Sequence, residues 1–183
     1  MVKLDLDGLA ARPDAWGPVL DKLLLGVTHN ISNRVATLAG VSDILAGDPT
    51  IPPILRALSD EVPRLEEGIR LLRLLAAPED EGEEALEATR ITDDAISLVE
   101  LHPDCRNISF EIIDRREVPP VIARPTALTH AIVVALANAV ADPGSGGSPA
   151  KIPIVFASDE RDLVISVGSA TVRARLLSAG RSG

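Results

Sequence analysis

The stretch GVTHNISNRVATLAG, residues 26–40, places one histidine and two asparagines inside a segment with a helical hydrophobic pattern. A neutral imidazole has a nucleophilic ring nitrogen that can accept a transferred group, such as a phosphoryl group. A helix with about 3.6 residues per turn brings His29 and Asn33 together on one side, where the amide can hydrogen bond to the ring. His29 and Asn33 are therefore candidate catalytic residues.

The apolar side chains of this segment recur every three or four residues, and His29 falls on the opposite side of the helix. These apolar residues are Leu20, Leu24, Val27, Ile31, Val35 and Leu38. This placement argues against a histidine satisfied inside the core. Two alternatives stay open at this point: a nucleophile that accepts a phosphoryl group, or an ordinary solvated polar side chain.

Composition limits the classes of partner. The chain has 183 residues, of which 46% are hydrophobic and only 2% aromatic, so an aliphatic core is expected. The net charge of −9 disfavours binding to nucleic acid or to an anionic membrane. The single cysteine, Cys105, excludes an intrachain disulfide and a cysteine-based zinc site. No apolar run has the length of a membrane span and no signal peptide is evident, so we expect a cytoplasmic protein.

The elements that would position these residues form an α+β chain. The pattern predicts helices over 13–46, 52–76, 92–102 and 125–142, strands over 108–115, 152–158 and 162–169, and a short edge strand over 119–124. Thr92 is expected to cap the third helix. The acidic segment 76–85 divides a helical hairpin, residues 1–78, from a small α/β sandwich, residues 84–183. A lone hairpin leaves apolar surface uncovered, so a homodimer with a four-helix bundle is expected.

The other two histidines have structural interpretations. His102 stands at a predicted helix end, where a histidine complements the helix dipole. His130 lies on the strongly apolar helix and is interpreted as a residue of the helix face. The three histidines lack the spacing of metal ligands, so no metal site is expected.

The stretch THNISNRVATLAGVSDIL resembles the H-box of two-component sensor histidine kinases and of phosphorelay histidine phosphotransferases. The resemblance places His29 at the phosphate-accepting position. It places Asn30 where an acidic general base usually stands, and Asn33 at an amide position that can orient the ring or the phosphoryl group. The order of segments over residues 15–170 is also similar to a kinase hairpin and the first part of its ATP-binding domain, with Asn138 at the position of a magnesium-binding asparagine.

The same resemblance shows what is missing for ATP chemistry. The adenine-binding turn, Asp-x-Gly-x-Gly, is replaced by VISVGSATVRARLL, in which Gly168 has no preceding aspartate. The glycine-rich segment DPGSGGSPA has no lysine, which argues against a P-loop. We therefore expect no bound cofactor and no ATP-dependent kinase activity, and Asn138 is interpreted as a structural amide.

The resemblance implies a phosphorelay histidine phosphotransferase. His29 would carry a phosphoryl group between aspartates of response-regulator receiver domains, and the receivers would supply the Mg²⁺. Asn30 and Asn33 would orient the imidazole and the incoming group. The alternative is a non-catalytic dimeric adaptor, or a degenerate kinase that binds signalling partners without passing phosphate.

Overall fold

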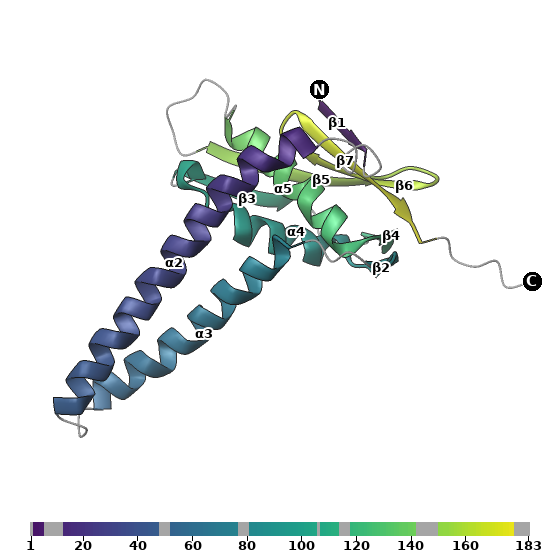
Figure 1. Ribbon diagram of the computed structural model, residues 1–183. Coiled ribbons are helices and arrows are strands. Elements are labelled where there is room, and N and C mark those ends of the chain that lie inside the picture. The colour runs from purple at the N-terminus through teal and green to yellow at the C-terminus, as the bar shows by residue number, and fades with distance from the viewer. Residues whose placement is uncertain are drawn as a thin grey trace, which may run out of the picture.

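The computed structural model describes residues 2–5, 13–47, 52–76, 81–105, 107–113, 118–141 and 150–177. The described chain forms a long helical hairpin and a mixed sheet, with two further helices between them (Figure 1). The expected α+β architecture is therefore confirmed. The expected turn at 48–50, the centre of the acidic linker at 77–80 and the glycine-rich loop at 142–149 lie outside the described residues.

The hairpin consists of α2, Pro13–Gly47, and α3, Pro52–Leu74, and its tip points away from the sheet (Figure 1). α3 continues through Pro63, which stands inside it. The predicted apolar stripe of α2 divides in two: Val27 is fully buried, whereas Leu24 and Val35 remain 37% and 50% exposed. Among the helices of the described ranges, none combines the length and the apolar run needed to cross a bilayer.

The sheet is mixed. Its strands are β1 Val2–Asp5, β2 Glu84–Leu86, β3 Ile108–Ile113, β4 Val121–Ala123, β5 Ala150–Ser158, β6 Asp162–Val167 and β7 Ala170–Leu176. Their order is β2-β4-β7-β6-β5-β3, with β1 paired to β7. The β3–β5 and β1–β7 pairs are parallel, and the other pairs are antiparallel. Alternate residues of β6 are buried, as expected for a strand with one face on the core.

The pattern analysis did not anticipate three of these strands. β1, β2 and β7 were not predicted, and β4 lies between β2 and β7 rather than at an edge. In β7 the buried positions include Ala170 and Ala174. Arg173 and Arg175 occupy two of the three alternate positions, so the alternation of strong β-formers is weak. β2 lies in the acidic segment, where Leu86 is its one buried residue.

The two helices of the α/β part are α4, Ala88–Val99, and α5, Pro125–Ala141. α4 begins one turn earlier than predicted, so the cap assigned to Thr92 is wrong. The Thr92 hydroxyl instead donates a hydrogen bond to the Ala88 carbonyl at 2.8 Å from inside the helix. α5 is buried on almost every side because the sheet contacts one face and α2 contacts another (Figure 1).

The hairpin and the α/β part share one hydrophobic core. Leu23 and Val27 of α2 are both 0% exposed and belong to the same cluster as Leu98 and Leu136. Burying each such aliphatic side chain contributes roughly 1.5–3 kcal/mol to stability. Where α2 passes the end of α4, a side chain on Gly26 would collide with the main-chain carbonyl oxygen of Leu101, just beyond α4. The absence of a side chain at this position therefore permits the close contact.

Two stacked aromatic rings lie at the base of the hairpin and connect it to α5. The rings of Trp16 on α2 and His130 on α5 are 3.9 Å apart and inclined by 19°. Nε2 of His130 lies 3.0 Å from the carbonyl oxygen of Leu74, the last residue of α3. His130, interpreted from the sequence as a residue of the helix face, thus joins three helices. We call these three residues the Trp16–His130 joint.

We expect Gly26→Ala to lower the free energy of unfolding by about 1–3 kcal/mol, because the added methyl group forces α2 away from Leu101. Gly40→Ala on the same helix is the matched control, since it meets nothing within 4 Å. That substitution is expected to raise the free energy of unfolding by up to about 1 kcal/mol. Urea unfolding measures both, and equal stabilisation by the two alanines would contradict the contact.

The Trp16–His130 joint also predicts a pH dependence. Burial lowers the pKa of His130 below its ordinary value of 6.5, and the Leu74 carbonyl and Glu81 offset part of this shift. Below about pH 6.5 the unfolded chain therefore binds a proton that the folded chain resists, so the free energy of unfolding falls with acidification. Urea unfolding followed by Trp16 fluorescence, at about pH 7.5 and pH 5.5, measures this loss.

His130→Gln is the matching variant, because glutamine can still donate to the Leu74 carbonyl but does not titrate. It should lose less stability between the two pH values than the wild type. Part of the loss of stability that remains in the variant is expected to come from His102, because burial also lowers the pKa of His102. The same pH dependence in both proteins would show that His130 stays equally protonated in the folded and unfolded chains.

Candidate functional site

His29 lies near the middle of α2 with its side chain exposed, one turn beyond the contact between Gly26 and Leu101. The buried face of α2 carries Leu23 and Val27, so packing on that face holds the backbone under the histidine. His29 is therefore an accessible imidazole on a fixed helix. The structure agrees with the sequence in excluding a core histidine at this position.

Asn33 is the partner of the His29 ring. Its Nδ2 lies 3.1 Å from Nδ1 of His29, one turn along α2. An amide nitrogen only donates, so in this orientation Nδ1 accepts and the ring hydrogen is on Nε2. Turning the amide over places its oxygen opposite Nδ1, which then carries the hydrogen and leaves the Nε2 lone pair free. In either orientation the Asn33 amide contacts Nδ1, and the orientation that the amide adopts decides which ring nitrogen carries the hydrogen.

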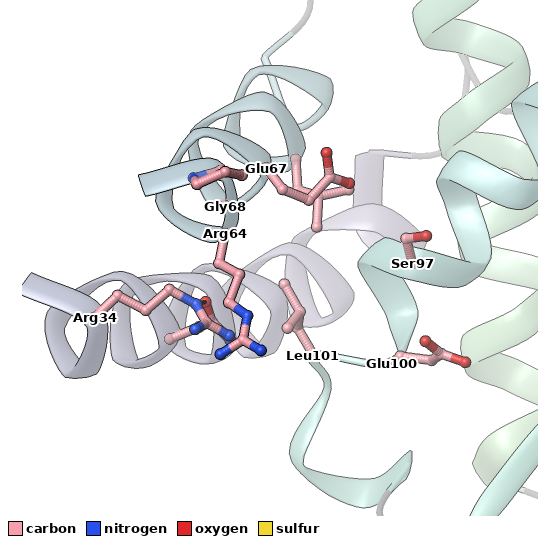
Figure 2. Close-up of a pocket in the computed structure, with 10 residues that line it drawn as sticks. Arg34, Arg64, Glu67, Gly68, Ser97, Glu100 and Leu101 are labelled. Atoms are coloured by element: carbon pink, nitrogen blue, oxygen red, sulfur yellow. Dashed lines mark hydrogen bonds between the residues drawn. The ribbon is translucent and has the colours of Figure 1, made fainter. Parts of the chain in front are cut away.

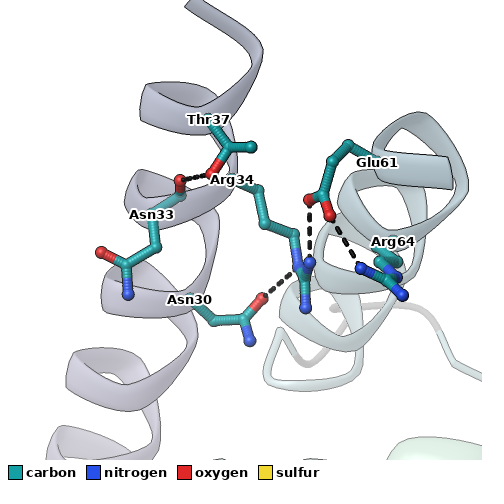
Figure 3. Close-up of polar contacts among 6 residues, drawn as sticks. All are labelled: Asn30, Asn33, Arg34, Thr37, Glu61 and Arg64. Atoms are coloured by element: carbon teal, nitrogen blue, oxygen red, sulfur yellow. Dashed lines mark hydrogen bonds and ion pairs between the residues drawn. The ribbon is translucent and has the colours of Figure 1, made fainter. Parts of the chain in front are cut away.

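Asn30 is turned toward α3, although it follows His29 directly. Its Oδ1 accepts a hydrogen bond from Arg34 Nε at 3.1 Å (Figure 3). Arg34 Nη1 donates to Glu61 Oε2 at 2.9 Å, and Arg64 Nη1 donates to the other oxygen of Glu61 at 2.8 Å. We call Asn30, Arg34, Glu61 and Arg64 the arginine bracket. The structure therefore brings His29 and Asn33 together and places Asn30 in a link between the two hairpin helices.

The arginine bracket was not identified from the sequence. Two signals were present: Asn30 and Arg34 are four residues apart, and Glu61 and Arg64 are three apart. The step between the helices, from Arg34 to Glu61, requires the register of the hairpin. The hydrogen bond from Arg34, followed by the contacts with Arg64, holds the pKa of Glu61 below its ordinary range. Glu61 therefore stays ionised at neutral pH and keeps both guanidinium groups in place.

The remaining candidate residues lie elsewhere. His102 is buried, and its Nδ1 accepts a hydrogen bond from the main-chain nitrogen of Asp104 at 3.2 Å. Burial lowers the pKa of His102, which disfavours the charged form that an interaction with a helix dipole would use. Asn138 on α5 is exposed and lines a pocket of about 150 Å³ together with Lys22 and His102. Within the described residues, no three His, Cys, Asp or Glu side chains converge on a possible metal position.

Gly168 occupies a tight turn between β6 and β7. Its φ of +54° is in the left-handed region that glycine adopts readily, and Val167 pairs with Ala170 across the turn. The segment expected to lack a nucleotide-binding turn is thus a short hairpin connection. Cys105 is buried, and this burial raises its pKa to about 11, so the thiol is protonated at neutral pH.

Comparisons with known proteins find two kinases with low similarity to this chain. No protein-family model matches it. Sporulation kinase E of Bacillus subtilis (strain 168) is 25% identical over 132 residues, which are 71% of this chain and 18% of that protein. The solved structure of Acinetobacter baumannii histidine kinase AdeS covers 76% of this chain and 71% of its own, with 14% identity and a TM-score of 0.39. The match therefore spans less than a fifth of the sporulation kinase.

Proposed function

We propose that this protein is a histidine phosphotransferase of a cytoplasmic phosphorelay, which passes a phosphoryl group between response-regulator aspartates through His29 without ATP. The observation that carries the proposal is the exposed His29 ring with the Asn33 amide on its Nδ1. The sequence match to sporulation kinase E supports a role in two-component signalling.

The chemistry requires only one nucleophile from this chain. With the Asn33 amide turned over so that its oxygen accepts the hydrogen of Nδ1, the Nε2 lone pair attacks the phosphorus of an aspartyl phosphate on the first receiver. The N–P bond forms as the bond from phosphorus to the aspartyl oxygen breaks, and the carboxylate leaves with the electron pair. The aspartate of a second receiver reverses the step. In this proposal the receivers bring Mg²⁺, which offsets the negative charge of the transferred group.

The C-terminal part supports a route that does not use ATP. Gly168 and Ser169 close a two-residue connection between β6 and β7, and this leaves little backbone in the turn to surround a nucleotide. Asn138 lies beside the first half of α2, in the small pocket that it shares with Lys22. We propose that the α/β part serves as a rigid support for the hairpin and a surface for the receiver.

The hairpin carries the surface expected of a dimer. Leu24 and Val35 of α2, and Val62 and Ile69 of α3, are between 37% and 50% exposed. The two residues of each pair are close to a whole number of helical turns apart, so they lie on the same side of their helix and present a strip of apolar surface to water. A second hairpin that packs against these strips forms a four-helix bundle, and we propose that this homodimer is the functional unit.

One observation favours the alternative of an adaptor without catalysis. Asn30 has no acidic group and its amide oxygen is engaged by Arg34, so Asn30 supplies no general base to His29. A protein descended from a kinase could keep the dimer and the partner-binding surface without passing phosphate. Phosphoryl transfer from a receiver distinguishes the two functions.

The first test mixes the protein with a radiolabelled, phosphorylated receiver. We expect acid-labile, alkali-stable label on the wild type and none on His29→Gln. Asn33→Ala should slow labelling by about fivefold, because a neutral hydrogen bond contributes about 1 kcal/mol. Asn138→Ala is the control on α5 and should transfer at the wild-type rate. Label that persists in His29→Gln would sink the proposal, and a tight complex without label in the wild type would establish the adaptor.

The second test measures the particle mass by light scattering. The wild type should have twice the 19.3 kDa mass of the chain at micromolar concentration. The double variant Val35→Lys/Ile69→Lys should be monomeric, because it places charges in both apolar strips. Ile113→Lys is the control, since Ile113 is 44% exposed on β3, away from the hairpin. A wild-type particle of one chain would remove the dimer.

A further inference from the structure

A pocket of about 390 Å³ lies where α2, α3 and α4 meet (Figure 2). Two guanidinium groups stand on one side and polar groups of α4 on the other, with aliphatic side chains between them. The residues that matter here are Arg34, Arg64, Leu71, Ser97, Glu100 and Leu101. A volume of this size at the junction of two structural parts is typical of sites for small molecules.

The two guanidinium groups retain hydrogen-bonding capacity. Both are held by the single carboxylate of Glu61, which places them next to one another (Figure 3). A guanidinium has five N–H donors. Among the hydrogen bonds of the described residues, Arg34 uses Nε and Nη1, and Arg64 uses Nη1. This side of the pocket therefore carries one positive charge more than Glu61 neutralises, with donors available for an oxyanion.

The opposite side restricts the charge of the ligand. Ser97 and Glu100 project from the end of α4, across the pocket from the arginines (Figure 2). Glu67, which also lines the pocket, is held by two hydrogen bonds of 2.8 Å from Arg70. Its carboxylate is thus paired within α3, whereas a second negative charge on a ligand would approach Glu100. These charges favour a ligand with a single anionic group at the arginine end.

The middle of the pocket is apolar. Leu71 is buried with 5% exposure, and Leu101 packs against the hydrophobic core beside it. A hydrocarbon body placed over these side chains removes apolar surface from water. We propose that this pocket binds a compact organic monoanion, with its carboxylate on Arg34 and Arg64 and its apolar body over Leu71 and Leu101. This inference goes beyond the proposed function and does not depend on it.

The position of the site also connects it with His29. Arg34 lines the pocket and holds the amide of Asn30, the residue that follows His29 in the chain. A bound carboxylate would share the Arg34 guanidinium with Asn30 and Glu61. Ligand occupancy thus changes the hydrogen bonds that fix the hairpin next to the exposed imidazole.

The test uses benzoate as the probe and benzamide as its neutral counterpart of the same shape. Each is titrated into the isotope-labelled full chain, and the backbone amide signals of Gly68 and Ser97 are followed by NMR. We expect saturable shifts with benzoate in the millimolar range. Benzamide should bind about tenfold more weakly, because it cannot form the charge-assisted bonds to the arginines.

Three variants locate the site. Arg64→Gln should weaken benzoate binding about tenfold, and Arg64→Lys should bind with intermediate affinity because it keeps the charge without the planar fork. Arg73→Gln, also on α3 but outside the pocket, is the matched control and should bind like the wild type. The unchanged remainder of the spectrum verifies that each variant is folded. Absence of saturable shifts, or equal benzoate affinity in Arg64→Gln and Arg73→Gln, would overturn the proposal.

Discussion

α2 carries His29 on one face and buries another face in the hydrophobic core, and the positions of the other elements depend on this packing. One face of α2 buries Leu23 and Val27 against α4 and α5, and Gly26 brings its backbone against the Leu101 carbonyl. The position of the hairpin therefore depends on this close contact, which any side chain larger than hydrogen at residue 26 would prevent. This contact lies one turn before His29, so it helps to fix the backbone that carries the histidine.

The polar groups of the site divide according to the faces of that helix. Asn33 shares the exposed face with His29 and bonds its ring, whereas Asn30 faces α3 and joins the arginine bracket. Two asparagines that look equivalent in the sequence thus have different physical roles. One affects the hydrogen on the imidazole, and the other affects the separation and register of the two hairpin helices. The α/β part supports the hairpin through the contact of α2 with the end of α4.

The sequence was sufficient for features that depend on local periodicity. The bounds of α2, the pairing of β5 with β6 and the contact of His29 with Asn33 follow from spacings of two, three or four residues. It was insufficient where distant segments decide the outcome. The alternation of buried and exposed residues in β7 consists largely of alanines and arginines, so its hydrophobic pattern is weak. β2 is defined by its pairing with β4. The turn of Asn30 toward α3 required Arg34 and Glu61 to meet across the hairpin, a contact that only the tertiary fold supplies.

The strand that precedes the hairpin has a consequence for the order of folding. β1 pairs in parallel with β7, so Val2 lies beside Ala170 although the hairpin and most of the sheet separate them along the chain. The hairpin helices can form early because their contacts are local, whereas the β1–β7 ladder closes a loop of almost the whole chain. Among the described elements, β1 is separated from its partner β7 by the hairpin and the rest of the sheet. Until that ladder closes, the backbone groups of β1 are not paired with β7, so this pairing is expected to follow the local contacts of the hairpin.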